Sequence, residues 1–489
     1  MAQKFGEGKA GTGCGLRPAL VSIFISDDGG AFSSMRENAP EKRPFGLKFV
    51  LLNNRRHDHK IVIKILGARI PPGTTGRPRR TITTMQGTRG SVTVMRTTTI
   101  RTTPSPFAAS GDGFPSSISY ELTLESVFDA YFECRKHKRN TINQLRFEAD
   151  LERNLVNLYH DLCGGSYKIG RSVAFVVQHP KTREIWAADF RDRIVHHLIY
   201  HAIRNRFECR FVRDSYACIA GRGTHDGMRR VSGFARSITQ NWTRDAYFLK
   251  ADIANFFGSI DRNILLGLVV RHVSEDWLSS LIKQVALHDP RENAVFRSSR
   301  ALFAKVPPHK SLLYAPDGKG LPIGNLTSQF FANIYLNEID QFVKHRLRAP
   351  YYGRYVDDMV LLHDDPGVLN SWYDQIDDFL QDRLALKLHH GKKQLNRVAH
   401  GLDFTGFVIK PGRTYLRRSS LARCKRKISG WERSENPHDP FVLARLSHSM
   451  NSYLGQLRQV NGYRARKKMC QRVESLFLRA DIEYTKLIC

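Results

Sequence analysis

Two adjacent aspartates, Asp357 and Asp358, stand in a short turn between two apolar runs, and this segment constrains the fold more than any other. Residues 351–362 read YYGRYVDDMVLL, a pattern that predicts two short buried strands joined by a tight turn. Hairpin turns ordinarily favour Asn-Gly or Asp-Gly instead of Asp-Asp. Negative charge between buried strands is costly unless a cation compensates it, so the segment indicates a cation site. The alternative is a solvated turn, the usual setting of an isolated Asp-Asp pair.

A third aspartate, Asp252, follows the apolar start of residues 247–253. Alone, an aspartate at the end of a strand is most often a helix N-cap. Together with Asp357 and Asp358 it offers hard oxygen ligands from separate strands, which is what two Mg²⁺ ions need in phosphoryl transfer.

The charge of the chain indicates the kind of partner. Its 76 Lys and Arg residues against 46 Asp and Glu give a net charge of +30. An excess of this size is typical of proteins that bind nucleic acid, so a carboxylate cluster here favours a polymerase or nuclease centre. The sequence has no run of about 18 apolar residues and no secretory h-region, which predicts no membrane partner and a cytoplasmic location. The 8 cysteines include no C-x-x-C pair, so no zinc site or disulfide framework is predicted.

Several segments, taken together, resemble one known family. Tyr355-Val356-Asp357-Asp358 resembles the box that reverse transcriptases carry on their catalytic hairpin, and Lys250-Ala251-Asp252-Ile253 resembles the other metal-binding strand of the same sheet. Further boxes follow in the family's order, namely DFRDRIVHH from residue 189, GRGTH from 221, GLPIGNLTSQ from 320 and LDFTGF from 402. The resemblance covers about residues 122–430. It implies an α+β fold of the right-hand polymerase type, with fingers, a palm built on a ferredoxin-like sheet, and a helical thumb.

The resemblance also implies a division of the chain and an activity. We expect fingers with the start of the palm over residues 119–240, the palm over 241–412 and a basic helical thumb over 413–489. The implied activity is RNA-directed DNA polymerisation, in which the primer 3′-OH attacks the α-phosphate of a dNTP. The partners would be template RNA, the RNA–cDNA duplex and dNTPs. The implied ligands of two Mg²⁺ ions are Asp252, Asp357, Asp358 and the Ile253 carbonyl.

Three residues are expected to contact the nucleotide. Lys181 and Arg183 lie on a hairpin predicted over residues 173–188, where fingers cations would neutralise the triphosphate, and ordinary surface charge is the alternative. Phe257 falls five residues after Asp252, where the family places an aromatic ring that excludes a 2′-OH. A core aromatic residue is equally compatible with that spacing.

Other cations are expected to bind the nucleic acid or the leaving group. Arg222 and His225 in the GRGTH segment would approach a nucleic-acid backbone, with a plain loop as the alternative. Lys392 and Lys393 are expected near the departing pyrophosphate, or else form a solvated pair. A duplex is held mainly through its backbone, so a basic helical tail suffices as a thumb. The thumb cations expected there are Arg417, Arg418, Lys425 and Lys427.

Two residues indicate a branch of the family. Most reverse transcriptases carry Gln in the place of Ile323 and Pro in the place of Gln329, whereas the form Ile-Gly-x-x-x-Ser-Gln resembles the bacterial diversity-generating retroelement branch. That resemblance implies that both residues lie at the nucleotide site, that copying is error-prone, and that the product serves mutagenic retrohoming. It also implies a small basic helical accessory protein as partner. The alternatives are a defence-associated bacterial reverse transcriptase and, from another class, a non-catalytic RNA-binding scaffold.

Residues 1–118 form a low-order basic segment rich in Thr, Arg and Gly. Residues 81–103 show neither helical periodicity nor strand alternation. Read one frame over, with Thr as ACA, Ile as ATC and Arg as CGG, residues 96–103 become Asp-Asn-Asn-Asn-Pro-Asp-Asn. Because AAC codons maximise mutable adenines, one hypothesis is that the segment is a translated template repeat. The alternative is a disordered basic arm that binds RNA.

Overall fold

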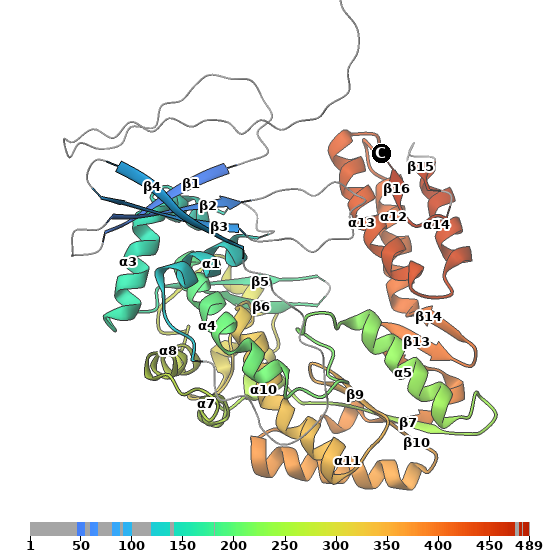
Figure 1. The fold of residues 1–489 in the computed structure, drawn as a ribbon. Helices are drawn as coiled ribbons and strands as arrows, with labels where there is room; N and C mark the ends of the chain where they lie inside the picture. The colour runs from blue at the N-terminus through green and yellow to red at the C-terminus, as the bar shows by residue number, and fades with distance from the viewer. Residues whose placement is uncertain are drawn as a thin grey trace, which may run out of the picture. The chain divides into compact units, whose positions relative to one another are not determined.

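The structure is a computed structural model of the whole chain (Figure 1). The chain divides into two compact units, Met1–Gly113 and Phe114–Cys489. Predictions for residues outside the described ranges are not addressed by the structure. The described ranges are 46–53, 59–66, 81–88, 91–99, 119–136, 141–179, 181–474, 479–481 and 483–488.

The N-terminal unit contains one antiparallel sheet whose strands pair in sequential order. Thr is β-branched and favours extended backbone, so the Thr-rich residues 81–88 and 91–99 pair as antiparallel strands although their sequence lacks strand alternation. Regular strands thus occur in a segment for which the sequence predicts no fold. The hypothesis that this segment is a translated template repeat stays a prediction. The strands are β1 (Gly46–Asn53), β2 (His59–Leu66), β3 (Thr81–Thr88) and β4 (Ser91–Thr99).

A layer of helices opens the second unit. Its first helix begins at a capping box, in which Thr123 Oγ1 accepts a hydrogen bond from the Ser126 amide at 3.1 Å. Leu155 and Leu158, which lie on one helix face, are fully buried in the core of this layer. The helices are α1 (Leu124–Arg135), α2 (Ile142–Glu148), α3 (Leu151–Cys163) and α4 (Phe190–Glu208).

Between α3 and α4 the chain forms the predicted hairpin, from β5 (Ser172–Val177) and β6 (Arg183–Ala187). A later segment, residues 290–319, adds β8 (Ala294–Phe296) parallel to β5 and makes the sheet β6-β5-β8. We call residues 290–319 the insertion. Its other elements are α9 (Arg300–Phe303), η1 (Pro308–Lys310) and η2 (Leu312–Tyr314).

The central sheet has the strand order β11-β7-β10-β9, and all neighbouring strands are antiparallel. Helix α10 (Leu326–Gln341) lies between β7 and β9 in the chain, and α11 (Pro366–Leu384) connects β10 to β11. This β-α-β-β-α-β order is that of a ferredoxin-like sheet. The strands are β7 (Tyr247–Asp252), β9 (Tyr352–Tyr355), β10 (Asp358–His363) and β11 (Gln394–Arg397).

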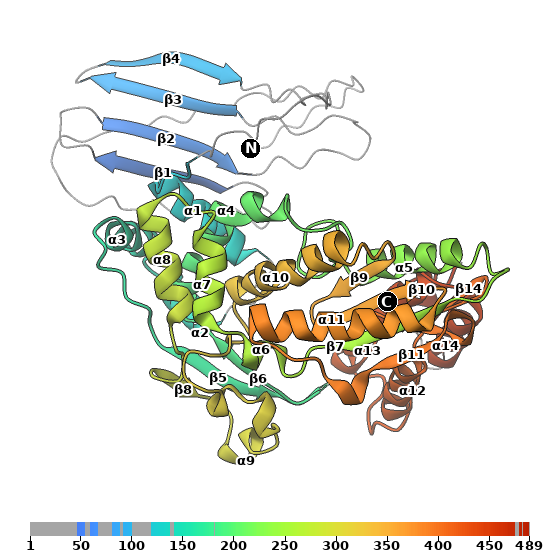
Figure 2. The ribbon, with the colours of Figure 1, turned by 90° about the horizontal axis from the view of Figure 1, so that it is seen from below.

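Helices cover both faces of the central sheet, and Figure 2 shows α10 and α11 on one of them. Met359 and Leu361 of β10 belong to the core shared with α10 and α11. Val360 and Leu362 belong to the core shared with α5 (Thr224–Ile238). Side chains alternate between the faces of a strand, so a strand buried on both faces reads as a continuous apolar run. This is why the sequence after the two aspartates shows no polar alternation.

Three short helices follow β7, namely α6 (Phe256–Ser259), α7 (Arg262–Val270) and α8 (Asp276–Leu287). Helix α7 begins where Asp261 Oδ1 accepts hydrogen bonds from the amides of Asn263 and Ile264, at 2.9 and 3.1 Å. Short connecting elements complete the central region. They are η3 (Phe342–Arg346), η4 (His390–Lys392) and η5 (Val398–His400).

The C-terminal part is helical, as predicted, and has its own core around Cys424, Leu446 and Met450. The apolar stretch of residues 402–409 forms a hairpin and not one continuous strand, because Thr405 and Gly406 take positive φ angles of 49° and 90° and turn the chain. No helix within the described ranges is long and apolar enough to cross a membrane. The elements are β12 (Leu402–Phe404), β13 (Phe407–Lys410), β14 (Arg413–Leu416), α12 (Arg418–Glu432), α13 (Pro440–Arg458), α14 (Tyr463–Glu474), β15 (Arg479–Ala480) and β16 (Leu487–Ile488).

Candidate active site

Three aspartates meet at one end of the central sheet. Asp252 lies directly opposite Asp358 in the pairing of β7 with β10, and Asp357 precedes Asp358 in the turn between β9 and β10. Asp252 is buried, with 8% of its surface exposed. Burial, and after it the charge of Asp252, raises the pKa of Asp357 to about 6. Burial and the neighbouring carboxylate thus both disfavour the ionised form of Asp357.

Two lysine amines lie against this carboxylate cluster. Lys392 Nζ contacts Asp252 Oδ2, and Lys250 Nζ lies 3.6 Å from Asp358 Oδ1. In this arrangement, no group of three or more His, Cys, Asp or Glu side chains among the described residues has metal-site geometry. Carboxylates are nevertheless the donors that Mg²⁺ prefers, and the raised pKa of Asp357 indicates a demand for positive charge. The residues present therefore suit divalent cations in charge and donor chemistry.

The turn that carries Asp357 has an unusual backbone. Val356 adopts a positive φ of 55°, which a β-branched residue rarely takes. Its carbonyl accepts a hydrogen bond from Arg354 Nη1 at 2.9 Å, and Arg354 also pairs with Asp340 of α10. Sequence reasoning missed the roles of Arg354 and Asp340. The available signal was a single arginine within the otherwise uncharged stretch YYGRYV.

A cavity of about 410 Å³ opens beside the three aspartates and brings most of the predicted nucleotide residues together. Lys181 and Arg183 line it from the β5–β6 hairpin, and Phe257, which is half-buried, lines it from α6. Ile253 and Ile323 line it as well. An adjoining cavity of about 430 Å³ shares several of these residues and is lined by Gln329. The structure thus brings the nucleotide residues predicted from sequence to one place.

The loop of residues 320–325 is fixed against the hairpin through its backbone. The Trp186 amide donates a hydrogen bond to the Ile323 carbonyl at 2.7 Å. Gly324 has a φ of 138°, and a Cβ there would lie 3.1 Å from the Trp186 carbonyl oxygen, so only glycine fits without strain. On the adjoining cavity, Cys218 Sγ lies 3.5 Å from Gln329 Oε1. These contacts set where Ile323 and Gln329 stand.

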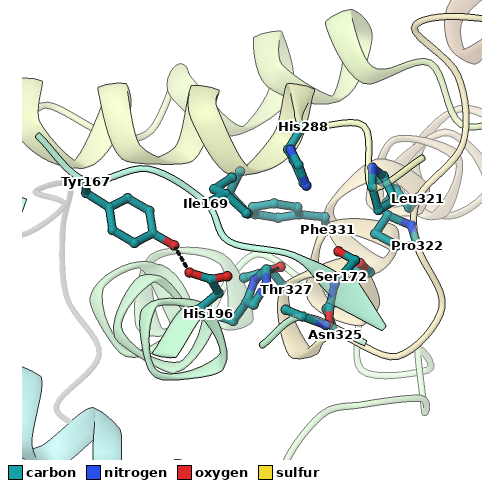
Figure 3. A pocket seen from close by; sticks show the side chains of 15 residues that line it. Tyr167, Ile169, Ser172, His196, His288, Leu321, Pro322, Asn325, Thr327 and Phe331 are labelled. Atoms are coloured by element: carbon teal, nitrogen blue, oxygen red, sulfur yellow. Dashed lines mark hydrogen bonds between the residues drawn. The ribbon is translucent and has the colours of Figure 1, made fainter. Parts of the chain in front are cut away.

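A small polar pocket of about 20 Å³ is lined by other residues of the same loop and by α4 (Figure 3). Tyr167 Oη donates a hydrogen bond to Asp192 Oδ1 at 2.8 Å, and His196 Nδ1 lies 2.7 Å from Thr327 Oγ1. Burial lowers the pKa of His196 to about 3, so its ring is neutral at pH 7. The second contact joins helix α10 to helix α4, and none of the predicted site residues lines this pocket.

The cations of the GRGTH segment face the protein itself. The Arg222 guanidinium is half-buried and donates hydrogen bonds to the carbonyls of Val212 and Ser215, at 2.6 and 3.1 Å. Burial lowers the pKa of Arg222, and it also lowers that of His225, whose ring meets Phe407 edge-on at 5.6 Å. The structure therefore gives both side chains internal partners, and a contact with nucleic acid stays a prediction.

The remaining predicted cations divide between the cavity and the C-terminal helices. Arg417 lines the cavity of the three aspartates and pairs with Asp403. Lys393 Nζ lies 4.1 Å from the centre of the Tyr373 ring in a cation–π contact, and Lys393 does not line the cavity of the three aspartates. The cations of helix α12 do not line either of the two large cavities. The α12 cations that the sequence predicts as thumb residues are Arg418, Lys425 and Lys427.

Residues 178–409 match a family model described as "Reverse transcriptase (RNA-dependent DNA polymerase)". The match includes the three aspartates, strand β6 and the loop of residues 320–325. It supports a reverse transcriptase domain over this part of the chain, and with it RNA-directed DNA polymerase activity.

Curated proteins and solved structures are similar over parts of the chain. Protein YkfC of Escherichia coli is 22% identical over 299 residues, which cover 54% of this chain and 73% of that protein. An uncharacterized 91 kDa protein in the cob intron of Schizosaccharomyces pombe is 24% identical over 155 residues, covering 32% of this chain and 16% of that protein. Telomerase from Candida albicans with a TWJ fragment of telomeric RNA has a TM-score of 0.37 and 12% identity, over 63% of this chain and 55% of that chain. Apo telomerase from Candida tropicalis has a TM-score of 0.41 and 11% identity, over 63% of this chain and 57% of that chain.

Proposed function

We propose that the chain is an RNA-directed DNA polymerase of the right-hand type. The central sheet is the palm, the β5–β6 hairpin belongs to the fingers, and α12 to α14 form the thumb. The observation that carries the proposal is the pairing of Asp252 with Asp358 beside a cavity that Lys181 and Arg183 also line. A cavity with acidic and basic sides suits a substrate that arrives as a metal-bound phosphate ester.

Each side of the cavity has its own task in this reaction. Two Mg²⁺ ions, held by the three aspartates and the Ile253 carbonyl, would stabilise charge on the attacking and leaving oxygens. Arg183 and Lys181 would bind the triphosphate, Arg183 through a forked contact. Phe257 would pack under the sugar and exclude a 2′-OH, since its ring lines both large cavities. Lys392, next to Asp252, would offer its ammonium group to the departing pyrophosphate.

Primer extension on an RNA template tests the polymerase assignment. Asp357→Asn should abolish dNTP incorporation while leaving RNA binding nearly unchanged, because template affinity comes from Lys and Arg. Asp382→Asn is the matched control, since Asp382 is exposed on α11 and lies away from the cavity. Substantial polymerisation by the Asp357 variant would refute the assignment. Loss of activity in both variants would show that the effect is not specific.

We further propose error-prone copying for a diversity-generating retroelement, assisted by a small basic helical accessory protein. Ile323 lines both large cavities where most of the family carries Gln, so an apolar side chain borders the nascent base pair in place of a polar one. The rival idea of a non-catalytic scaffold leaves unexplained why three carboxylates are kept so close that repulsion helps raise the pKa of Asp357. The genomic neighbourhood decides between this role and a defence role. A near-identical repeat pair with a small basic gene supports the retroelement, and a surrounding set of defence genes contradicts it.

A further inference from the structure

The insertion delivers a cation to the cavity that sequence reasoning did not anticipate. Lys310, the last residue of η1, is exposed and lines the cavity together with Asp252, Asp357 and Asp358. No acidic side chain among the described residues pairs with it. Lys310 lies 127 residues after Arg183 in the sequence, yet both line the same cavity.

The other cations of the cavity fall into two groups. Three are neutralised by carboxylates, since Lys250 lies near Asp358, Lys392 contacts Asp252, and Arg417 pairs with Asp403. The second group has no acidic partner in the described part of the chain and consists of Lys181, Arg183 and Lys310. Three unpaired cations around one cavity favour an anionic ligand, and a chain of phosphoryl groups offers several negative oxygens to them.

A buried carboxylate fastens the insertion to the hairpin. Glu184, next to Arg183 on β6, is 3% exposed. Its Oε2 accepts hydrogen bonds from Trp186 Nε1 at 3.1 Å and from the Leu312 amide at 2.9 Å, while its Oε1 accepts one from Ser311 Oγ. Ser311 directly follows Lys310, so these bonds fix the backbone that carries the lysine. A buried carboxylate with all these donors is costly to disturb.

We propose that Lys310 is a third triphosphate-binding cation and that Glu184 is the residue that positions it. This inference rests on the proposed polymerase function and deepens it, because it assigns the dNTP triphosphate to the insertion as well as to the hairpin. Glu184 ties residues 311 and 312 to β6, so the backbone next to Lys310 is held to the strand that carries Arg183. A phosphate of the template backbone is the competing ligand for Lys310, and the experiment below separates the two.

Steady-state primer extension with varied dNTP tests the role of Lys310. Lys310→Ala should raise the KM for dNTP about tenfold, because one charge-assisted contact is lost. It should leave kcat within about twofold and the Kd for a primer–template duplex unchanged. Lys310→Arg should restore most of the affinity. The matched control is Lys305→Ala, since Lys305 is exposed in the same insertion and does not line the cavity.

A double-mutant cycle tests the positioning role of Glu184. Ser311→Ala removes one of its donors and should raise the KM for dNTP several-fold, but it should cause little further increase in a chain that already carries Lys310→Ala. Additive effects would contradict positioning through Lys310. An unchanged KM for dNTP in Lys310→Ala, or a loss of affinity for the primer–template duplex in its place, would overturn the triphosphate assignment. Primer extension by the wild-type chain would still support the polymerase assignment in that case. A wild-type chain that extends no primer would overturn both proposals.

Discussion

Arg354 and Asp340 form an ion pair that is sealed from solvent, with 1% and 0% of the two side chains exposed. Arg354 Nε and Nη2 donate to the two carboxylate oxygens of Asp340 at 2.7 and 2.6 Å, a forked geometry that lysine cannot reproduce. The remaining Arg354 nitrogen, Nη1, donates a hydrogen bond to the carbonyl of Val356. Helix α10 thus supports the strained turn that carries Asp357.

Changing this arginine should slow catalysis more than it weakens binding. Arg354→Lys keeps the charge but loses the contact with Val356, so we expect kcat to fall at least about tenfold. The KM for dNTP and the duplex Kd should stay close to wild type. Arg346→Lys, at an exposed position of η3, is the control. An Arg354→Lys enzyme with normal kcat would show that the turn at Val356 keeps its shape without the hydrogen bonds of the guanidinium group.

Removing the partner carboxylate should affect stability. Asp340→Asn leaves Arg354 buried without a counter-charge, which should lower the free energy of unfolding by about 3–5 kcal/mol. Urea denaturation followed by circular dichroism measures the change. A loss below about 1 kcal/mol would mean that water or another group replaces the carboxylate.

Ile323 should control copying accuracy. If an apolar side chain beside the nascent pair relaxes the check on base-pair geometry, Ile323→Gln should improve discrimination by about 1–3 kcal/mol. Errors opposite template adenines, counted in sequenced cDNA, should therefore fall about 5- to 150-fold. An unchanged error spectrum would refute the role, and equal error rates at all four template bases in wild type would contradict the retroelement assignment.

Phe257 should select the sugar. Phe257→Ala opens the space under the ribose, so the ratio of kcat/KM for rATP against dATP should rise about 10- to 200-fold. If the ring serves only the core, the variant loses stability and the ratio stays as it was. Thermal unfolding measured beside the kinetics distinguishes these results.

Acid should destabilise the fold partly through His196. Burial lowers its pKa from 6.5 to about 3, with His197, His288 and Arg193 adding repulsion. Below pH 6.5 the unfolded chain binds a proton at this ring and the folded chain does not, so this contribution to stability is complete above pH 6.5 and falls toward pH 3. The slope should reach about 1.4 kcal/mol per pH unit. His196→Gln should flatten the profile of unfolding free energy between pH 6 and pH 4, and an unchanged slope would contradict the assignment.

The sequence predicts the aspartate site because its signals are local. Two apolar runs around Asp357 and Asp358 indicate a buried hairpin, and β7 ends at Asp252 in the same way. The role of Lys310 depends on Ser311 meeting Glu184 across 127 residues, and no periodicity encodes that contact. Arg222 is a different case: its guanidinium donates hydrogen bonds to two carbonyls that its motif does not predict, while the nucleic-acid contact that the motif does predict stays a prediction.

The hydrogen bond between the Trp186 amide and the Ile323 carbonyl joins the strand that begins at Arg183 to the loop that would border the base pair in the proposed function. In that function, nucleotide binding and tolerance of a mismatched base would depend on one connected stretch of backbone. A lineage that changed its mutation rate through this loop would also change the nucleotide concentration at which it copies. Selection on the error rate of copying would then also act on the affinity for nucleotide, and neither property could change without the other.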